Sequence, residues 1–161
     1  QRIDAGQPFT VIVDFAHTPQ ALAAVLETSR GLCRRRVILV VGHPGERYAP
    51  HRPAIGTLAV RHADLAILTA DDPYGEDKDQ IIDQIVSGAV AAGGVESRDF
   101  LVIRERRDAI KAAIDLARPG DLVLIAGRGH LREMVIGDRR IPFNDAEVAT
   151  AALRRAITAA A

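Results

Sequence analysis

Several residue types are scarce in this chain, and their scarcity excludes whole classes of function. Only 4% of the 161 residues are aromatic and none is tryptophan, so the stacking platforms of single-stranded nucleic-acid binding are not provided. Basic and acidic residues number 21 each, and the zero net charge creates no overall field that would attract nucleic acid or a membrane surface. We therefore expect no nucleic-acid partner and no membrane partner.

Cysteine and long apolar runs are scarce as well. Cys33 is the single cysteine, so neither a disulfide framework nor a zinc cluster can be built, and a reducing cytoplasm is the expected setting. No apolar run approaches the roughly 20 residues of a membrane-spanning helix. No G-x-x-x-x-G-K-[ST] phosphate loop occurs in the sequence. Because the sequence begins with Gln1 and not methionine, we expect one domain, residues 1–161, excised from a longer protein.

What the sequence does have is an alternation of apolar, β-branched runs with amphipathic segments. Five runs predict strands, at residues 9–13, 37–41, 65–68, 100–103 and 122–125. They are almost continuously apolar, which is typical of parallel strands covered on both faces. Helical spacing of apolar residues is found between them, at residues 22–26, 54–62, 81–89 and 109–117. The pattern predicts a Rossmann-like, doubly wound α/β sheet, mostly parallel, with helices on both faces.

The C-terminal part follows a different pattern. Residues 135–136 and 140–142 flank a Gly-Asp-Arg turn and predict a hairpin. Asn144 is expected to cap a last helix, because Glu147 follows three residues later as in a capping box. In a doubly wound sheet, ligands bind at the carboxyl ends of the strands. That rule selects four loops as candidate sites.

Two of these loops follow the first and second predicted strands. Asp14 ends the first strand, where its carboxylate could accept hydrogen bonds from a ribose diol, and His17 lies just before a helix. A helix cap with a turn histidine is the plainer alternative. The second loop, residues 42–53, has glycines whose N–H groups could approach an anion and arginines that could bind a carboxylate. Its plainer alternative is a flexible basic loop.

The third loop contains the acidic stretch TADDPYGED, residues 69–77. It is a poor metal site, because Pro73 and Tyr74 fall where the ligands of a calcium loop should be. Its later carboxylates are expected at the start of the next helix, where the helix dipole favours them. Asp71 and Asp72, at the strand end, are therefore the candidates for ligand binding.

The fourth loop, residues 127–133, reads GRGHLRE. Its two glycines, with Arg128 and His130, suggest a close approach of the backbone to a ligand. A structural histidine is the alternative, and no Ser-His-Asp or Cys-His set can be argued from the spacing.

Taken in order, these motifs resemble the C-terminal domain of the Mur ligases, and most closely the MurE type. The strings VDFAHTP, G-x-x-G-E-R with R-P, DDP, AGRGH and IPFND match the family patterns D-Y-A-H-T-P, G-x-G-G-D-R with K-R-P, D-N-P-R, A-G-K-G-H-E and I-P-F-S-D. The resemblance covers residues 7–153. It implies part of an ATP-dependent ligase that adds an amino acid to UDP-N-acetylmuramoyl-dipeptide in peptidoglycan synthesis.

The resemblance also implies what this domain does within the complete enzyme. ATP and Mg²⁺ would be used by the full-length protein, whose N-terminal and central domains would be the partners of this one, together with the UDP-muramoyl peptide and the amino acid. The isolated domain would hold no metal, contribute no catalytic residue and be inactive alone. Three residues would contact ATP: Asp14, Phe15 and His17. Seven would form the amino-acid pocket: Arg47, Asp71, Asp72, Tyr74, Gly127, His130 and Leu131.

Two positions depart from the family pattern. Tyr74 stands where ligases for meso-diaminopimelate have an arginine for the distal carboxylate, and Leu131 stands where they have a glutamate. Asp72, in place of asparagine, adds negative charge. Losing a bidentate arginine would leave a carboxylate unpaired. We therefore expect lysine or ornithine to be preferred over meso-diaminopimelate.

Other functions stay open at this point. The same departures, with His43 and Pro44, are compatible with a MurE-like paralogue that has another substrate. A non-catalytic, Rossmann-type module that binds a nucleotide or an amino acid is the alternative from another class. A sibling ligase of the folylpolyglutamate or cyanophycin type is disfavoured by the strings IPFND and AGRGH.

Overall fold

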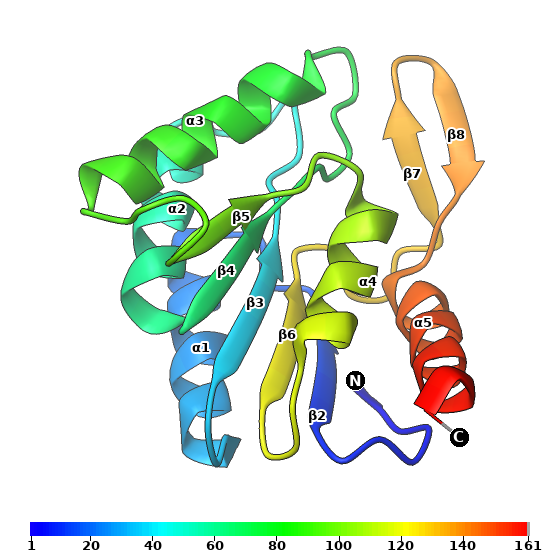
Figure 1. Ribbon diagram of the computed structural model, residues 1–161. Helices are drawn as coiled ribbons and strands as arrows, with labels where there is room; N and C mark the ends of the chain where they lie inside the picture. The colour runs from blue at the N-terminus through cyan, green and yellow to red at the C-terminus, as the bar shows by residue number, and fades with distance from the viewer. Residues whose placement is uncertain (161) are drawn as a thin grey trace.

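The computed structural model describes residues 1–160. The elements of this range follow one another along the chain as Figure 1 shows: β1 (Arg2–Ile3), β2 (Thr10–Asp14), α1 (Pro19–Leu32), β3 (Val37–Val41), α2 (His51–His62), β4 (Leu65–Leu68), α3 (Lys78–Ala91), β5 (Phe100–Val102), α4 (Arg106–Leu116), β6 (Leu122–Ala126), β7 (Glu133–Ile136), β8 (Arg139–Pro142) and α5 (Asp145–Ala160).

Six of the strands form one sheet in the order β1-β2-β6-β3-β4-β5. β2, β6, β3, β4 and β5 are parallel, and the short β1 pairs antiparallel with β2. Helices α1 to α3 lie on one face of this sheet, while α4 and α5 lie on the other (Figure 1). The doubly wound α/β prediction is therefore confirmed, including the C-terminal hairpin, which is formed by β7 and β8.

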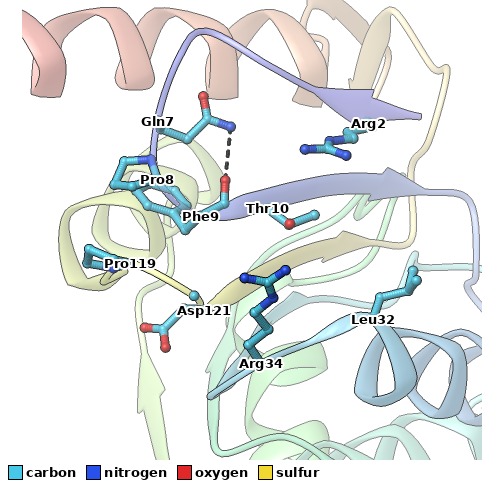
Figure 2. A pocket seen from close by; sticks show the side chains of 10 residues that line it. Arg2, Gln7, Pro8, Phe9, Thr10, Leu32, Arg34, Pro119 and Asp121 are labelled. Carbon is cyan, nitrogen blue, oxygen red and sulfur yellow. Dashed lines mark hydrogen bonds between the residues drawn. The ribbon is translucent and has the colours of Figure 1, made fainter.

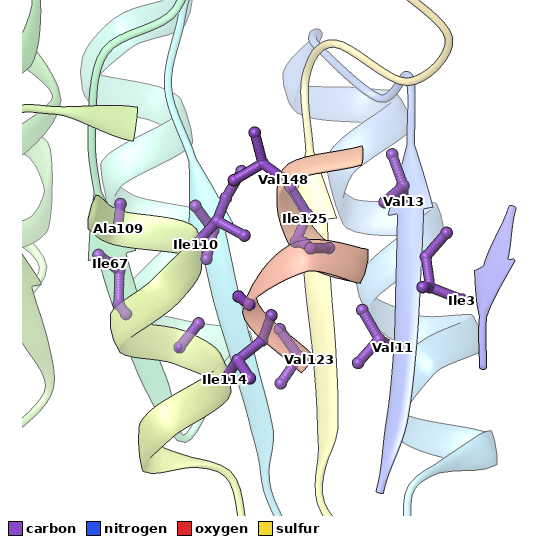
Figure 3. Close-up of a cluster of buried hydrophobic side chains, with 14 of the residues drawn as sticks. Ile3, Val11, Val13, Ile67, Ala109, Ile110, Ile114, Val123, Ile125 and Val148 are labelled. Atoms are coloured by element: carbon purple, nitrogen blue, oxygen red, sulfur yellow. The ribbon is translucent and has the colours of Figure 1, made fainter. Parts of the chain in front are cut away.

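The central strands are buried because both of their faces are covered. All residues of β3 and β6 are buried, and alternate side chains enter two separate cores, as the strand period of two requires. Val123 and Ile125 face α4 and α5, where they pack with Ile110, Ile114 and other apolar residues (Figure 3). Leu122 and Leu124 belong to the core under α1 to α3. These near-continuous apolar runs are therefore strands, and not buried helices.

The helix starts follow from side-chain caps. Thr18 Oγ1 accepts a hydrogen bond from the N–H of Ala21, and Asp77 Oδ1 accepts from the N–H of Asp79 at 2.7 Å. Asn144 Oδ1 accepts from the N–H of Glu147 at 3.0 Å, which confirms the predicted cap of the last helix. Each of these bonds satisfies a helix N–H that has no partner within its own helix.

A buried ion pair fastens α5 to α4. The side chains of Arg106 and Asp145 are both 0% exposed. Two hydrogen bonds of 2.8 and 2.7 Å join the guanidinium to the carboxylate. The same guanidinium donates to the carbonyl oxygens of Ala126 at 2.9 Å and Ala70 at 3.4 Å. Arg106 thus also holds the carboxyl ends of β6 and β4, from which two candidate loops start.

Helices α2 and α3 touch through glycine, and this contact gives a first prediction. A Cβ added to Gly88 of α3 would lie 1.9 Å from the carbonyl oxygen of Pro53 in α2, whereas one added to Gly31 of α1 would meet nothing within 4 Å. We expect Gly88→Ala to lower the free energy of unfolding by about 1–3 kcal/mol. Gly31→Ala should raise it by about 0.5 kcal/mol, because alanine restricts the unfolded chain and favours helix. Urea unfolding followed by circular dichroism measures both, and changes of equal sign would contradict the packing argument.

Candidate functional site

The topology of the sheet predicts ligand-binding crevices at the carboxyl ends of its strands, on either side of β6. β6 lies between β2 and β3. The chain leaves β2 and β3 toward helices α1 and α2 on one face, but it leaves β6 toward the hairpin and α5 on the other face. Such switch points are where doubly wound sheets bind ligands. The loops after β2, β3, β4 and β6, which are the four selected from the sequence, all lie along this edge.

The crevice between β2 and β6 brings together three rings. Phe15 is 44% exposed, and its ring centroid lies 4.8 Å from that of His17 and 5.4 Å from that of His130. The N–H of Gly127 donates to the carbonyl of Asp14 at 3.2 Å, which holds the two loops together. Gly129 has a φ of +54°, and an added Cβ would lie 2.8 Å from that of Phe15. This cluster offers aromatic surface next to the half-buried carboxylate of Asp14.

The fourth loop therefore divides between the two crevices. The resemblance places His130 among the amino-acid residues, but in the structure its ring lies against that of Phe15. Leu131 is half-buried, and its carbonyl accepts a hydrogen bond from Asn144 Nδ2 at 3.0 Å. Leu131 thus joins the loop to the start of α5.

The crevice between β6 and β3 has a buried cluster at its base. Asp71 and Asp72 are each 4% exposed and Arg128 is 0% exposed. Nη1 of Arg128 donates to Oδ1 of Asp71 at 2.8 Å and to Oδ1 of Asp72 at 2.5 Å. Nη2 donates to the carbonyl of Glu133 in β7 at 2.5 Å. The arginine therefore links the loops after β4 and β6 with the hairpin.

Arg128 is the residue of this cluster whose pairing is not predicted from the sequence. Its place in GRGH suggests only that the loop approaches a ligand. A signal was present, because two adjacent carboxylates that end a buried strand require a partner when they are buried. What the sequence does not show is that the loop after β6 supplies this partner to the loop after β4.

The loops after β3 and β4 interlock. The N–H of Gly45 donates to the carbonyl of Asp72 at 2.7 Å, and an added Cβ on Gly45 would lie 1.9 Å from the carbonyl oxygen of Pro73. Glu46 and Tyr74 both have left-handed backbone, with φ of +54° and +51°. Such strain in two non-glycine residues persists only where the surroundings enforce it. These loops consequently form one unit.

Glu76 also holds these loops together, through contacts with Arg52 and Glu46. Its carboxylate lies 2.9 Å from Nη2 of the buried Arg52 and also accepts a hydrogen bond from the N–H of Glu46. The hydrogen bond from Arg52, followed by that from Glu46, lowers the pKa of the Glu76 carboxyl. Glu76 is therefore negatively charged at neutral pH and holds the loop after β3 in place.

Arg47 and Tyr74 lie together at the open side of this unit. The guanidinium carbon of the exposed Arg47 is 5.1 Å from the centroid of the Tyr74 ring. The N–H of Tyr74 donates to the carbonyl of Val135 at 3.2 Å, and the carbonyl of Tyr74 accepts from the N–H of Gly137 at 2.6 Å. The structure thus joins Arg47, Tyr74, the β7–β8 hairpin and the pair Asp71 and Asp72 through one series of contacts.

A buried histidine lies behind this crevice. His43 is 1% exposed, and its Nδ1 has no hydrogen-bond partner among residues 1–160. Burial lowers the pKa of His43 to about 4, and the positive charge of Arg52 acts in the same direction. Its ring lies 5.9 Å from that of His51. His43 is therefore neutral at physiological pH.

Three further observations concern metal binding, membrane spanning and a hollow at the opposite edge of the sheet. In the part of the chain that the structure describes, no group of three His, Cys, Asp or Glu side chains could hold a metal ion. No helix within residues 1–160 is both long and apolar enough to cross a membrane. A hollow of about 510 Å³ near Thr10, Arg34 and Asp121 lies at the amino ends of the strands, on the edge opposite the two crevices (Figure 2).

Comparison with known proteins places the chain in a family. It belongs to the family "Mur ligase, glutamate ligase domain", whose model matches residues 1–129. The resemblance read from the motifs is thereby confirmed. The match ends before the β7–β8 hairpin and α5.

Individual relatives show which members of the family the chain resembles. The chain is 43% identical over 154 residues to UDP-N-acetylmuramoyl-L-alanyl-D-glutamate--2,6-diaminopimelate ligase of Syntrophomonas wolfei, covering 96% of this chain and 31% of that protein. It is 44% identical over 153 residues to UDP-N-acetylmuramyl-tripeptide synthetase of a Roseiflexus species, covering 95% and 30%. A solved structure of a 2,6-diaminopimelate ligase of this type superposes with a TM-score of 0.86 at 32% identity, covering 98% and 31%. The chain thus spans less than a third of the length of these relatives.

Proposed function

We propose that this chain acts as the amino-acid-binding domain of an ATP-dependent ligase that adds an amino acid to UDP-N-acetylmuramoyl-dipeptide, a cytoplasmic step of peptidoglycan synthesis. The observation that carries the proposal is the pair of side-chain clusters at the carboxyl ends of the strands, one on either side of β6. One has exposed rings and Asp14, which suit a nucleotide, and the other has Arg47 and the Asp71 cluster, which suit an amino acid. The names of two relatives that are 43% and 44% identical to this chain over 154 and 153 aligned residues support the same reaction.

The side chains beside β2 and β6 suit the base and the ribose of ATP. Phe15, His17 and His130 would stack against a base, and the Asp14 carboxylate would accept hydrogen bonds from a ribose. ATP would supply the phosphoryl group that activates the peptide carboxylate for attack by the amine. Mg²⁺ would be held by the central domain of the complete enzyme, as the resemblance to the Mur ligases implies. Other domains would likewise bind the UDP-sugar, which matches the limited share of its relatives that this chain covers.

For the amino acid, we propose lysine or ornithine in preference to meso-diaminopimelate. Tyr74 supports this preference, because it offers no bidentate partner to a distal carboxylate. The extra charge of Asp72 supports it less than the sequence suggested, because Arg128 neutralises that carboxylate. The name of the Syntrophomonas relative specifies 2,6-diaminopimelate, whereas that of the Roseiflexus relative specifies no amino acid.

An assay of phosphate release tests both proposals. With the full-length enzyme, ATP and UDP-N-acetylmuramoyl-dipeptide, kcat/KM for lysine or ornithine should exceed that for meso-diaminopimelate by about 10- to 100-fold, since an unpaired carboxylate costs roughly 1–3 kcal/mol. Tyr74→Arg should shift the preference toward meso-diaminopimelate. The chain of residues 1–161 alone serves as the control and should release no phosphate.

The possible outcomes separate the alternatives. A preference of the wild-type enzyme for meso-diaminopimelate would contradict the proposed amino acid but leave the ligase intact. Absence of release with any amino acid would instead favour a paralogue with another substrate or a binding module. A start codon just upstream of Gln1, with no G-K-[ST] loop before it, would favour the module.

A further inference from the structure

The hollow at the amino ends of the strands (Figure 2) lies outside the proposed ligase site. Its volume is about 510 Å³, and its walls are the chain from β1 to β2, the end of α1 and the loop before β6. Arg2 lies opposite Ile12 in the pairing of β1 with β2, and Thr10 precedes Ile12 by two residues. The side chains of Arg2 and Thr10 therefore project from the face of the sheet that α1 covers. Arg34 lines the same hollow from the end of α1.

Hydrogen bonds hold the walls of the hollow together. Nε2 of Gln7 donates to the carbonyl oxygens of Ile3 at 3.0 Å and Phe9 at 3.2 Å, which fixes the loop between β1 and β2. The N–H of Gly120, in the loop before β6, donates to the carbonyl of Pro8 at 3.0 Å. The hollow is thus formed without a ligand, so that binding needs to order little of the chain.

The acidic side chain in these walls already has its partners. Asp121 has a side chain that is 0% exposed, and its Oδ2 lies 2.6 Å from Nη2 of Arg36. Its Oδ1 accepts from the main-chain N–H of Arg36 at 3.3 Å, and its Oδ2 accepts from that of Arg118 at 2.9 Å. Asp121 is therefore not available as a counter-ion for the other arginines of the hollow.

Arg2 and Arg34 have no counter-ion. Neither side chain forms an ion pair among the described residues. Figure 2 shows both guanidinium groups directed toward the space beside the side chain of Thr10. Two cations and one hydroxyl thus face a single hollow, which is also lined by the apolar side chains of Phe9 and Leu32.

We propose that this hollow binds a small phosphate monoester. Such a group has a charge of about −1.5 to −2 at neutral pH and three strong acceptor oxygens, which match two guanidinium groups and one hydroxyl. A carboxylate offers one charge and two oxygens, and matches the hollow less well. The space beside Phe9 and Leu32 is available to the organic part of the ligand. The proposal does not rest on the proposed ligase function.

Calorimetric titration of the full-length protein with phenyl phosphate tests the proposal. Arg2→Gln and Arg34→Gln should each raise the Kd about 10-fold, because each removes a charge-assisted hydrogen bond. Thr10→Val removes only the hydroxyl and should raise the Kd about 3-fold. Phosphate sites elsewhere in the protein are left unchanged by these substitutions, so the difference from the wild type reports the hollow alone.

Arg35→Gln is the matched control. Arg35 is an exposed neighbour of Arg34 that does not line the hollow, and its substitution changes the net charge by the same amount. The Kd should change less than about 2-fold at physiological ionic strength, because salt screens exposed charges.

Three further probes separate the possible sources of the phosphate group. Inorganic phosphate should bind about 5-fold more weakly than phenyl phosphate, because it has no apolar part to bury. Benzoate should bind about 10-fold more weakly, because it has a single charge. Vesicles of phosphatidic acid present the same phosphate group on a membrane surface, and they should retain the wild type and the doubly substituted Arg2→Gln, Arg34→Gln protein equally.

Each part of the proposal has an outcome that overturns it. An unchanged Kd in both Arg2→Gln and Arg34→Gln, or an equal rise in Arg35→Gln, would show that the hollow is not the site. Inorganic phosphate that binds as tightly as phenyl phosphate would overturn the ligand class and leave a site for the ion alone. Vesicle binding that depends on Arg2 and Arg34, without binding of phenyl phosphate, would assign the hollow to a lipid headgroup instead.

Discussion

Replacing Asp145 with asparagine should lower the free energy of unfolding by about 3–5 kcal/mol. The substitution leaves the guanidinium of Arg106 buried without its hydrogen-bonded counter-ion. The pair is 0% exposed on both sides, so water cannot enter to replace the carboxylate without opening the core between α4 and α5. Urea unfolding of the chain, followed by circular dichroism, measures the change.

A surface pair provides the matched control. Asp83 lies 3.0 Å from Arg104, but its side chain is 65% exposed. Asp83→Asn should therefore change the free energy of unfolding by less than about 1 kcal/mol. If the two aspartate substitutions had similar effects, the buried pair would not have the anchoring role assigned to it.

Lowering the pH from 6.5 to 4 should destabilise the wild-type chain through His43 by about 2–3 kcal/mol. The pKa of His43 is lowered by burial from its ordinary value of 6.5 to about 4. Between these values the unfolded chain binds the proton and the folded chain does not. The free energy of unfolding therefore falls as the pH falls through this window, and this contribution levels off below about pH 4.

The variant His43→Gln isolates this contribution from that of the carboxylates. Its free energy of unfolding should fall by about 2–3 kcal/mol less than that of the wild type over the same pH range. His62, exposed at the end of α2, is the matched control, and His62→Gln should keep the wild-type loss. A His43→Gln titration parallel to the wild type would show that this histidine does not control the acid sensitivity.

The fold could be predicted from the sequence because its signals are local. Each buried parallel strand is a short apolar run, and capping residues such as Asn144 indicate where helices begin. Two features of the fold differ from the prediction: the presence of β1 and the start of α2. β1 has only two residues, too few for any pattern, and pairs with a strand that follows it. α2 begins three residues before its expected start, since a proline such as Pro53 is compatible with the first turn of a helix.

The candidate site was only partly predictable, because it is made of contacts between loops. The strand-end rule located Asp14, Asp71 and the glycine loops, since it depends only on topology. It could not reveal that Arg128 binds both aspartates or that His130 turns toward Phe15. The residues of these pairs lie about 60 and 115 positions apart in the sequence. Hydrophobic periodicity predicts helices and strands, but it does not show which side chains from distant loops meet.

The interlocked loops have a consequence for ligand recognition. The loops of the proposed amino-acid site are held together without a ligand: the N–H of Gly45 bonds to Asp72, the N–H of Tyr74 bonds to Val135, and Glu76 pairs with Arg52. Binding then orders little of the chain, so the loss of conformational entropy that weakens many flexible sites is small here. If the proposed function holds, selection among amino acids depends on how well each one fits a preformed surface, and a substitution in these loops should alter which amino acid is preferred.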